Sequence, residues 1–274
     1  MSGRGGESGA VGFARSVGDA VWSTPGVVGT VVLLVGDVCG RGLRVLARPR
    51  ASGARAVLLR VTIDQIYFTG VEAVPIVAGL ATLVGVTTIG VGFRTLTVLG
   101  AEGSFGTVLD KLILVELAPL LTAVIVAARS GSAVCTELLA MRLNDELDAL
   151  AAHGVDPWVY VGLPRLIGIT VGTACLTTVF ALATYAVTLV STIPLGIALP
   201  PFLASLAGAI EPQDVVLLWT KALLFGLAVA ATTMARGFRW GHDSSDLPRM
   251  ATRGAMDALI TIFLIDAVFA VLVR

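Results

Sequence analysis

The chain has 274 residues, of which 56% are hydrophobic and 14% charged, and its mean hydropathy is +0.91. Soluble domains are about 45–50% apolar and about 25% charged, so this chain has too few charged side chains to cover a water-facing surface. The 19 basic and 19 acidic residues balance, which argues against nucleic acid as a partner. Cys39, Cys135 and Cys175 lie far apart and offer neither a disulfide framework nor a metal site. The sequence predicts an all-α integral membrane protein.

Residues 1–60 are predicted to form a cytoplasmic tail with an interfacial helix. Residues 2–10 are rich in glycine and serine, and no short apolar core with a cleavage site follows them, so they do not resemble a signal peptide. Between about 11 and 46, an apolar run too short to cross about 30 Å of hydrocarbon precedes Arg41, Arg44 and Arg48. This pattern favours an amphipathic helix on the cytoplasmic face of the membrane, with a short true span as the alternative.

Five later stretches are long and apolar enough to cross a membrane. They cover about 66–92, 105–128, 165–193, 214–235 and 253–273. No charged residue occurs from Leu166 to Ile210, which indicates a span followed by an apolar outer loop. Prolines near position 200 predict that 195–210 is a short re-entrant or interfacial piece.

The basic residues predict the orientation of these spans. With the N-terminus in the cytoplasm, eight arginines precede the first span, three follow the second and four follow the fourth, so fifteen of the 19 basic residues are cytoplasmic. Basic residues concentrate on the cytoplasmic side of multi-pass proteins. We therefore expect five spans in the cytoplasmic (inner) membrane, with the C-terminus in the periplasm.

The segment between the second and third spans, residues 129–164, is called the insert below. Ser130 or Ser132 is expected to cap the start of a helix, and Gly154 is expected to end it in a left-handed conformation. Asp156 before a proline predicts the start of a short second helix, and Pro164 predicts another start just before the third span. The insert should therefore form a helix, a turn and a short helix before the chain re-enters the membrane.

The first helix of the insert is predicted to be amphipathic. Its leucines share one stripe, namely Leu139, Leu143, Leu147 and Leu150. Its charged residues lie mostly off that stripe, and Arg142 has the spacing to pair with Asp145 or Glu146. The pattern fits either a helix that packs its leucines on the bundle or a helix that docks on a soluble partner.

The insert resembles the signature of the MlaE/YrbE permeases, the membrane subunits of ABC transporters that move lipids together with Mce-domain proteins. The matching residues are Arg129, Gly131, Ser132, Ala133, Glu137, Leu138, Met141, Arg142, Glu146, Asp148, Ala149, Leu150, Gly154, Val155, Asp156, Pro157, Pro164 and Arg165. Support outside the insert comes from Glu116, Leu117, Pro119, Lys221, Ala251, Thr252, Ala255 and Asp266. The resemblance covers about residues 55–274, and residues 61–274 are taken as an MlaE-like permease domain. One departure is Asn144-Asp145-Glu146, where the family more often has Thr-Glu-Gln; the helix is thereby more acidic.

The resemblance implies a division of labour between chains. The insert would be the coupling helix that docks in a groove of a separate ABC ATPase, through Glu137, Met141, Arg142, Asp145, Glu146 and Asp148. Neither Lys111 nor Lys221 follows a glycine, so the chain has no phosphate-binding loop of the Gly-Lys-Ser/Thr type. ATP and Mg²⁺ would be bound by the partner ATPase, and this chain, without a cofactor or catalytic residues of its own, would not be an enzyme. The other expected partners are an Mce-domain (MlaD-like) protein, a second permease (an identical copy in a homodimer, or a close paralogue) and the lipid.

Ionisable residues inside spans are costly, by about 2.5–3.5 kcal/mol each on insertion scales, and are functional candidates by default. Glu116, Lys221 and Asp266 fall within predicted spans two, four and five. The lysine paired with either acid would offset the cost of burying both charges. Such pairs could simply hold the spans together, or they could border a cavity where a lipid headgroup meets Lys221.

The predicted function is thus that of an ABC-type permease for phospholipid or a related lipid, working between the cytoplasmic membrane and the periplasm or outer envelope. Two alternatives are an ion-coupled secondary transporter and a non-transporting membrane scaffold. Many secondary transporters contain an inverted repeat, which five spans without internal duplication do not provide.

Overall fold

The structure is a computed structural model that describes residues 52–100, 105–197, 199–238 and 247–272, together with Gly36, Val38 and Gly40. Within these residues, five helices are long and apolar enough to cross a membrane. They are Ala56–Val98, Phe105–Leu143, Trp158–Ser191, Pro212–Gly237 and Pro248–Leu272. The predicted five spans are confirmed at this level. The predicted interfacial helix at 11–46 falls outside the described residues, apart from the three helical positions just named.

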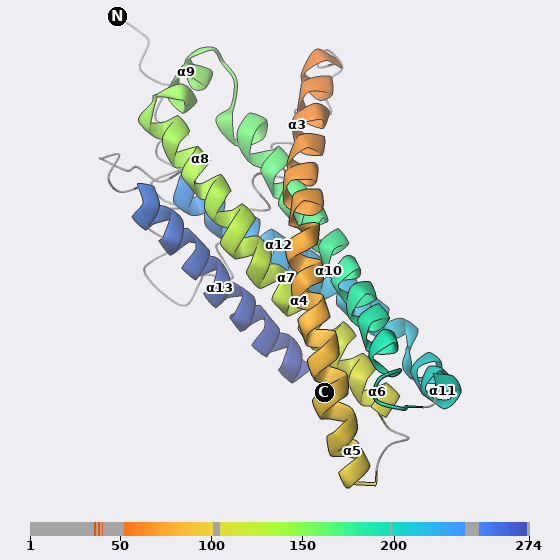
Figure 1. Cartoon of the computed structure of the whole chain (residues 1–274). Coiled ribbons are helices and arrows are strands. Elements are labelled where there is room, and N and C mark those ends of the chain that lie inside the picture. Colours follow the sequence, from red (N-terminus) through yellow and green to blue (C-terminus); the bar gives the residue numbers. More distant parts are fainter. Residues whose placement is uncertain are drawn as a thin grey trace, which may run out of the picture. The chain divides into compact units, whose positions relative to one another are not determined.

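The first span is a chain of short helical segments (Figure 1). They are α3 (Ser52–Gly70), the 3₁₀ turn η1 (Val71–Ala73), α4 (Val74–Thr87), the π-helical η2 (Thr88–Phe93) and α5 (Arg94–Val98). Pro75 lies in the first turn of α4, directly after the 3₁₀ turn η1. Local 3₁₀ adjustment is one way in which spans accommodate a proline.

The second span continues without a break into the insert. Its segments are α6 (Phe105–Asp110), the π-helical η4 (Lys111–Leu117), α7 (Ala118–Val126), the π-helical η5 (Ala127–Gly131) and α8 (Ser132–Leu143). This helix of 39 residues is about 58 Å long at 1.5 Å per residue. It exceeds the hydrocarbon thickness of about 30 Å, so part of it extends beyond the membrane.

The predicted serine cap at the start of the insert is wrong, because no helix begins there. Gly131 has right-handed helical geometry, and no side-chain cap is present. The hydroxyl of Ser132 instead donates to the carbonyl oxygens of Ala128 and Arg129, within its own helix. Serine can bond to the preceding turn in this way and stay in a helix interior.

The insert then turns twice before the third span. α8 ends at Leu143, Asp145 adopts φ +57°, and α9 (Glu146–Ala152) follows, so the expected single helix is two. Gly154 has φ +77°, as predicted for the end of this helix. The backbone N–H of Trp158 donates to Oδ1 of Asp156 at 3.0 Å, which confirms a helix start at that point.

The helix that starts there runs directly into the third span. The π-helical η6 (Trp158–Gly162) is continuous with α10 (Leu163–Ser191), and Leu163 has helical geometry. The predicted second start at Pro164 is therefore wrong. A π-helical turn precedes both Pro164 and Pro119, and local π-helical adjustment is one way in which spans accommodate a proline.

The remaining helices are α11 (Leu199–Ala209), α12 (Pro212–Gly237) and α13 (Leu247–Leu272). α11 has 11 residues and is too short to cross the membrane. It occupies the stretch for which a re-entrant or interfacial piece was predicted.

Close contacts divide the chain into two compact units. Of the described residues, the first unit comprises those up to 66, 127–169 and those from 227 onward, and the second comprises those within 67–126 and 170–226. In the first unit, α8 packs along α13 (Figure 1). A Cβ at Gly254 would lie 3.1 Å from the sulfur of Cys135, and a Cβ at Gly237 would lie 2.7 Å from Cβ of Leu138. Glycine at these two positions allows α12 and α13 to approach α8 closely.

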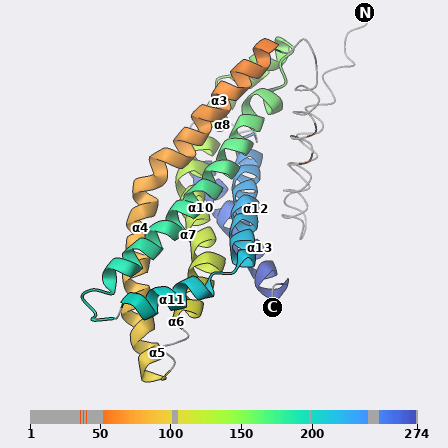
Figure 2. The same cartoon turned by 90° about the vertical axis from the view of Figure 1, so that its right-hand side faces the viewer.

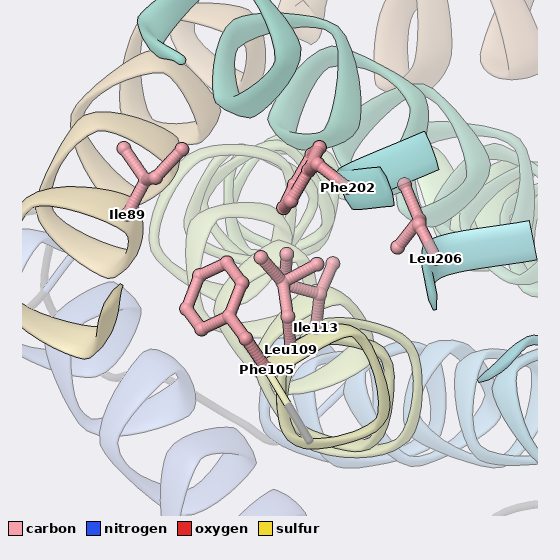
Figure 3. Close-up of a cluster of buried hydrophobic side chains, with 6 residues drawn as sticks. All are labelled: Ile89, Phe105, Leu109, Ile113, Phe202 and Leu206. Carbon is pink, nitrogen blue, oxygen red and sulfur yellow. The ribbon is translucent and has the colours of Figure 1, made fainter. Parts of the chain in front are cut away.

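A hydrophobic cluster of the second unit lies where α11 packs on α6 (Figure 2). Its buried residues are Ile89, Phe105, Leu109, Ile113, Phe202 and Leu206 (Figure 3). The rings of Phe105 and Phe202 lie 5.8 Å apart between centroids. Gly106 allows this approach, because a Cβ there would lie 2.6 Å from the carbonyl oxygen of Ser205. The short helix is therefore an integral part of this unit.

Candidate functional site

An ion pair between η4 and α12 forms the centre of the candidate site in the second unit. The ammonium of Lys221 donates to Oε2 of Glu116 at 2.9 Å. The side chain of Lys221 is 2% exposed, whereas that of Glu116 is 41% exposed. A buried cation is thus paired with a partly exposed carboxylate. The pairing predicted for Glu116 and Lys221 is present.

A second ion pair joins the same two segments with the opposite polarity. Lys111 on η4 donates to both carboxylate oxygens of Asp214 on α12, at 2.6 and 2.7 Å. Glu211 lies 3.8 Å from the same ammonium. Asp214 is buried and Lys111 is partly exposed. Sequence reasoning did not single out this pair, although a lysine inside an apolar run was a visible signal.

A buried carboxyl group lies next to this pair in the sequence. Asp110, at the end of α6, is fully buried, and the hydroxyl of Tyr185 on α10 donates to its Oδ1 at 2.7 Å. Its Oδ2 has no hydrogen-bond partner among the described residues. Burying a carboxyl is costly unless it is hydrogen-bonded, so Tyr185 offsets part of that cost. Sequence reasoning missed Asp110 as well.

The third residue predicted for a lipid path is in the other unit. Asp266 lies on α13, in the first unit, where its side chain is half-buried. The structure therefore brings together two of the three predicted residues, Glu116 and Lys221.

The residues predicted to couple to an ATPase all lie on α8, α9 and the turn between them. Asp145, in the turn, and Glu146 are exposed, and Met141 is half-buried. Arg142 donates to Asp148 at 3.0 Å across the turn, instead of to Asp145 or Glu146 as its spacing predicted. The left-handed Asp145 breaks the helical register on which that spacing depended. The predicted leucine stripe faces inward, because Leu139 and Leu147 are buried.

Glu137 differs from the other predicted coupling residues, because its ion-pair partner lies outside the insert, on α10. Oε1 of Glu137 forms an ion pair with Nη2 of Arg165, on α10, at 2.7 Å. The side chain of Arg165 is 9% exposed and that of Glu137 is 59% exposed. Two further links hold this unit together: Arg236 pairs with Asp257, and the rings of Trp158 and Phe238 stack with centroids 3.9 Å apart.

Apolar helices of spanning length, with ion pairs inside them and a polar helical insert, define a multi-pass helical membrane protein. The family model described as Permease MlaE matches residues 62–272. The chain therefore belongs to the MlaE permease family.

Known relatives agree with this assignment. A probable ABC transporter permease protein of Synechocystis is 32% identical over 207 residues, which cover 75% of this chain and 78% of the relative. A probable ABC transporter permease protein of Rickettsia prowazekii is 27% identical, over 75% of this chain and 80% of its own length. Protein TRIGALACTOSYLDIACYLGLYCEROL 1, chloroplastic, of Arabidopsis thaliana is 28% identical over 212 residues, which are 77% of this chain and 61% of that protein. The chain is thus an ABC transporter permease subunit; it is not itself catalytic, and it works with an ATPase partner.

Proposed function

We propose that this permease moves phospholipid or a related lipid between the cytoplasmic membrane and the periplasm or outer envelope. The observation that carries the proposal is the Lys221–Glu116 pair, a buried ammonium 2.9 Å from a half-exposed carboxylate. A charged pair inside a span is costly to keep unless it serves packing or transport. The name of the Arabidopsis relative contains that of a galactolipid, which supports a lipid as the cargo.

The chemistry of the pair suits a lipid headgroup. A phosphate carries the charge that the Lys221 ammonium binds best, and hydrogen bonds to charged groups contribute about 1.5–3 kcal/mol. Glu116, being half-exposed, can turn toward water when a phosphate takes its place beside the lysine. The acyl chains would lie against apolar side chains of the spans, where they lose no hydrogen bonds.

The insert is proposed to carry energy from the ATPase to the spans. α8 continues the second span, and the exposed charges of α9 and its preceding turn offer a surface for a soluble protein. We propose that the insert lies in the cytoplasm and the C-terminus in the periplasm. Two permease copies would each engage one ATPase subunit, and an Mce-domain (MlaD-like) protein would continue the lipid path on the periplasmic side.

The test is the amount of phospholipid that stays bound to the purified permease, measured by native mass spectrometry. Lys221→Met removes the ammonium and keeps the length of the side chain. It should lower bound phospholipid about tenfold or more, as loss of a charged hydrogen bond implies. Arg253→Gln, an exposed charge on α13, is the control and should bind as wild type. Unchanged lipid binding in Lys221→Met would disprove the assignment of the headgroup site.

A further inference from the structure

The Glu137–Arg165 ion pair joins the insert to the third span. Nη2 of Arg165 lies 2.7 Å from Oε1 of Glu137 in this ion pair, while Nη1 donates to the carbonyl oxygen of Val161 at 3.2 Å, one turn earlier in its own helix. The hydrogen bond to Val161 holds the guanidinium close to the backbone of its own helix. The carboxylate therefore meets a cation whose position is already set.

The two residues lie on helices that continue well beyond the pair. Glu137 is on α8, the end of the unbroken helix Phe105–Leu143. Arg165 is in the first turn of α10, which contributes residues 163–169 to the first unit and 170–191 to the second. A displacement of α8 at Glu137 is thus applied to a helix that also forms part of the unit holding Lys221 and Glu116.

The other contacts of α8 are of a different kind. Its buried face carries Val134, Cys135, Leu138 and Leu139. On that face, Cys135 lies against Gly254 of α13, and Leu138 lies against Gly237 at the end of α12. Glu137 is exposed and lies off that face. The buried, mostly apolar face of α8 therefore meets α12 and α13, and on it the thiol of Cys135 donates to the carbonyl oxygen of Met250. An ion pair joins α8 to α10.

The geometry points to Glu137 as a positioning residue that ties α8 to α10 and transmits ATPase-driven movement of the insert to the third span, instead of a residue that contacts the ATPase. This inference rests on the proposed function, because it needs an ATPase docked on the insert and a lipid to be moved. It separates Glu137 from Glu146, which is exposed on α9 and shows no ion pair within the described residues.

The test compares matched carboxylate deletions in the full complex of permease and ATPase. Glu137→Ala and its control Glu146→Ala each remove one glutamate from an exposed helical position. Two quantities are measured: the ATPase recovered with the tagged permease, and the lipid moved per ATP hydrolysed in proteoliposomes. Glu137→Ala should recover the ATPase as wild type does but lower lipid per ATP between about twofold and thirtyfold, the usual range for a coupling contact. Glu146→Ala should lower recovery of the ATPase, because Glu146 is exposed on the proposed docking surface.

The double variant Glu137→Ala/Arg165→Leu tests whether the two residues act through their mutual ion pair. Arg165→Leu should lower lipid per ATP as Glu137→Ala does, and the double variant should be no worse than either single one, because both remove the same interaction. Should Arg165→Leu fail to fold, Arg165→Lys keeps a buried cation and should lie between wild type and Glu137→Ala.

Each contrary result has its own meaning. Loss of the ATPase in Glu137→Ala, with lipid per ATP unchanged, would make Glu137 a docking residue and overturn the inference alone. Additive losses in the double variant would overturn it too. A wild-type permease that recovers no ATPase would overturn the proposed function, and this inference with it.

Discussion

At the scale of residues, the two ion pairs between η4 and α12 set the alignment of these helices. η4 presents a lysine at 111 and a glutamate at 116, and α12 presents an aspartate at 214 and a lysine at 221. Because the polarity is reversed between the pairs, sliding one helix until Lys111 meets Lys221 would oppose like charges. Charge complementarity therefore favours the observed register over the shifted one.

Because Lys221 is buried and Glu116 is half-exposed, we expect substitution of the glutamate to destabilise the protein more than substitution of the lysine. Glu116→Gln takes the carboxylate from a buried ammonium, and we expect a loss of about 1–3 kcal/mol, below the ~3–5 kcal/mol of a fully buried pair. Lys221→Met replaces a buried charge with an apolar side chain of similar length. It should cost less than about 1 kcal/mol, since such replacements are often neutral and Glu116 can be hydrated.

Thermal unfolding of the purified variants in detergent measures both effects. The melting temperature of Glu116→Gln should fall further than that of Lys221→Met. The reverse order would mean that the stability of this site does not depend on compensating the lysine charge.

At the scale of elements, glycine decides how closely α11 packs on α6. Gly106 and Gly208 are both glycines in short helices, but only the first meets a neighbour. A Cβ at Gly106 would lie 2.6 Å from backbone of Ser205, whereas a Cβ at Gly208 meets nothing within 4 Å. Backbone atoms cannot move aside as the end of a flexible side chain can.

We therefore expect Gly106→Ala to displace α11 and to cost about 1–3 kcal/mol, as for other overpacked sites. Gly208→Ala should be neutral or stabilise by up to about 1 kcal/mol, because alanine favours a helix. Maleimide labelling of a cysteine at Leu206, a buried residue of α11, reports the displacement. Labelling should accelerate with Gly106→Ala and stay slow with Gly208→Ala; equal rates would show that close packing at Gly106 does not hold α11.

At the scale of the whole molecule, the distribution of basic residues predicts which ends of the spans face the cytoplasm. His153 follows α9 in the insert, and Pro194 lies between α10 and α11; both are exposed. If the positive-inside rule holds, His153 is cytoplasmic and Pro194 is periplasmic.

Single cysteines at these positions test the orientation, in a chain whose own three cysteines are replaced. A membrane-impermeant maleimide should label the cysteine at Pro194 in intact spheroplasts, and the cysteine at His153 only after the membrane is opened. Labelling in the opposite order would invert the topology and place the insert outside the cytoplasm, away from any ATPase.

Local chemistry alone predicted much of this protein. Five apolar stretches, the left-handed Gly154 and the start at Asp156 follow from residues within one or two turns of each other, and the structure confirms them. Two other local predictions, the cap at Ser130 or Ser132 and a helix start at Pro164, were wrong. At these places the helix continues through π-helical turns that a cap or proline pattern does not indicate.

What the tertiary structure decided is which distant residues meet. Tyr185 lies 75 positions from Asp110, and Asp214 lies 103 positions from Lys111. Glu137, for which the family resemblance implied a docking role, forms an ion pair with Arg165 on another helix. Hydropathy and helix signals depend on neighbours along the chain, so the sequence determined the spans by itself. Partners across helices depend on which faces pack together, and only the folded chain decides that.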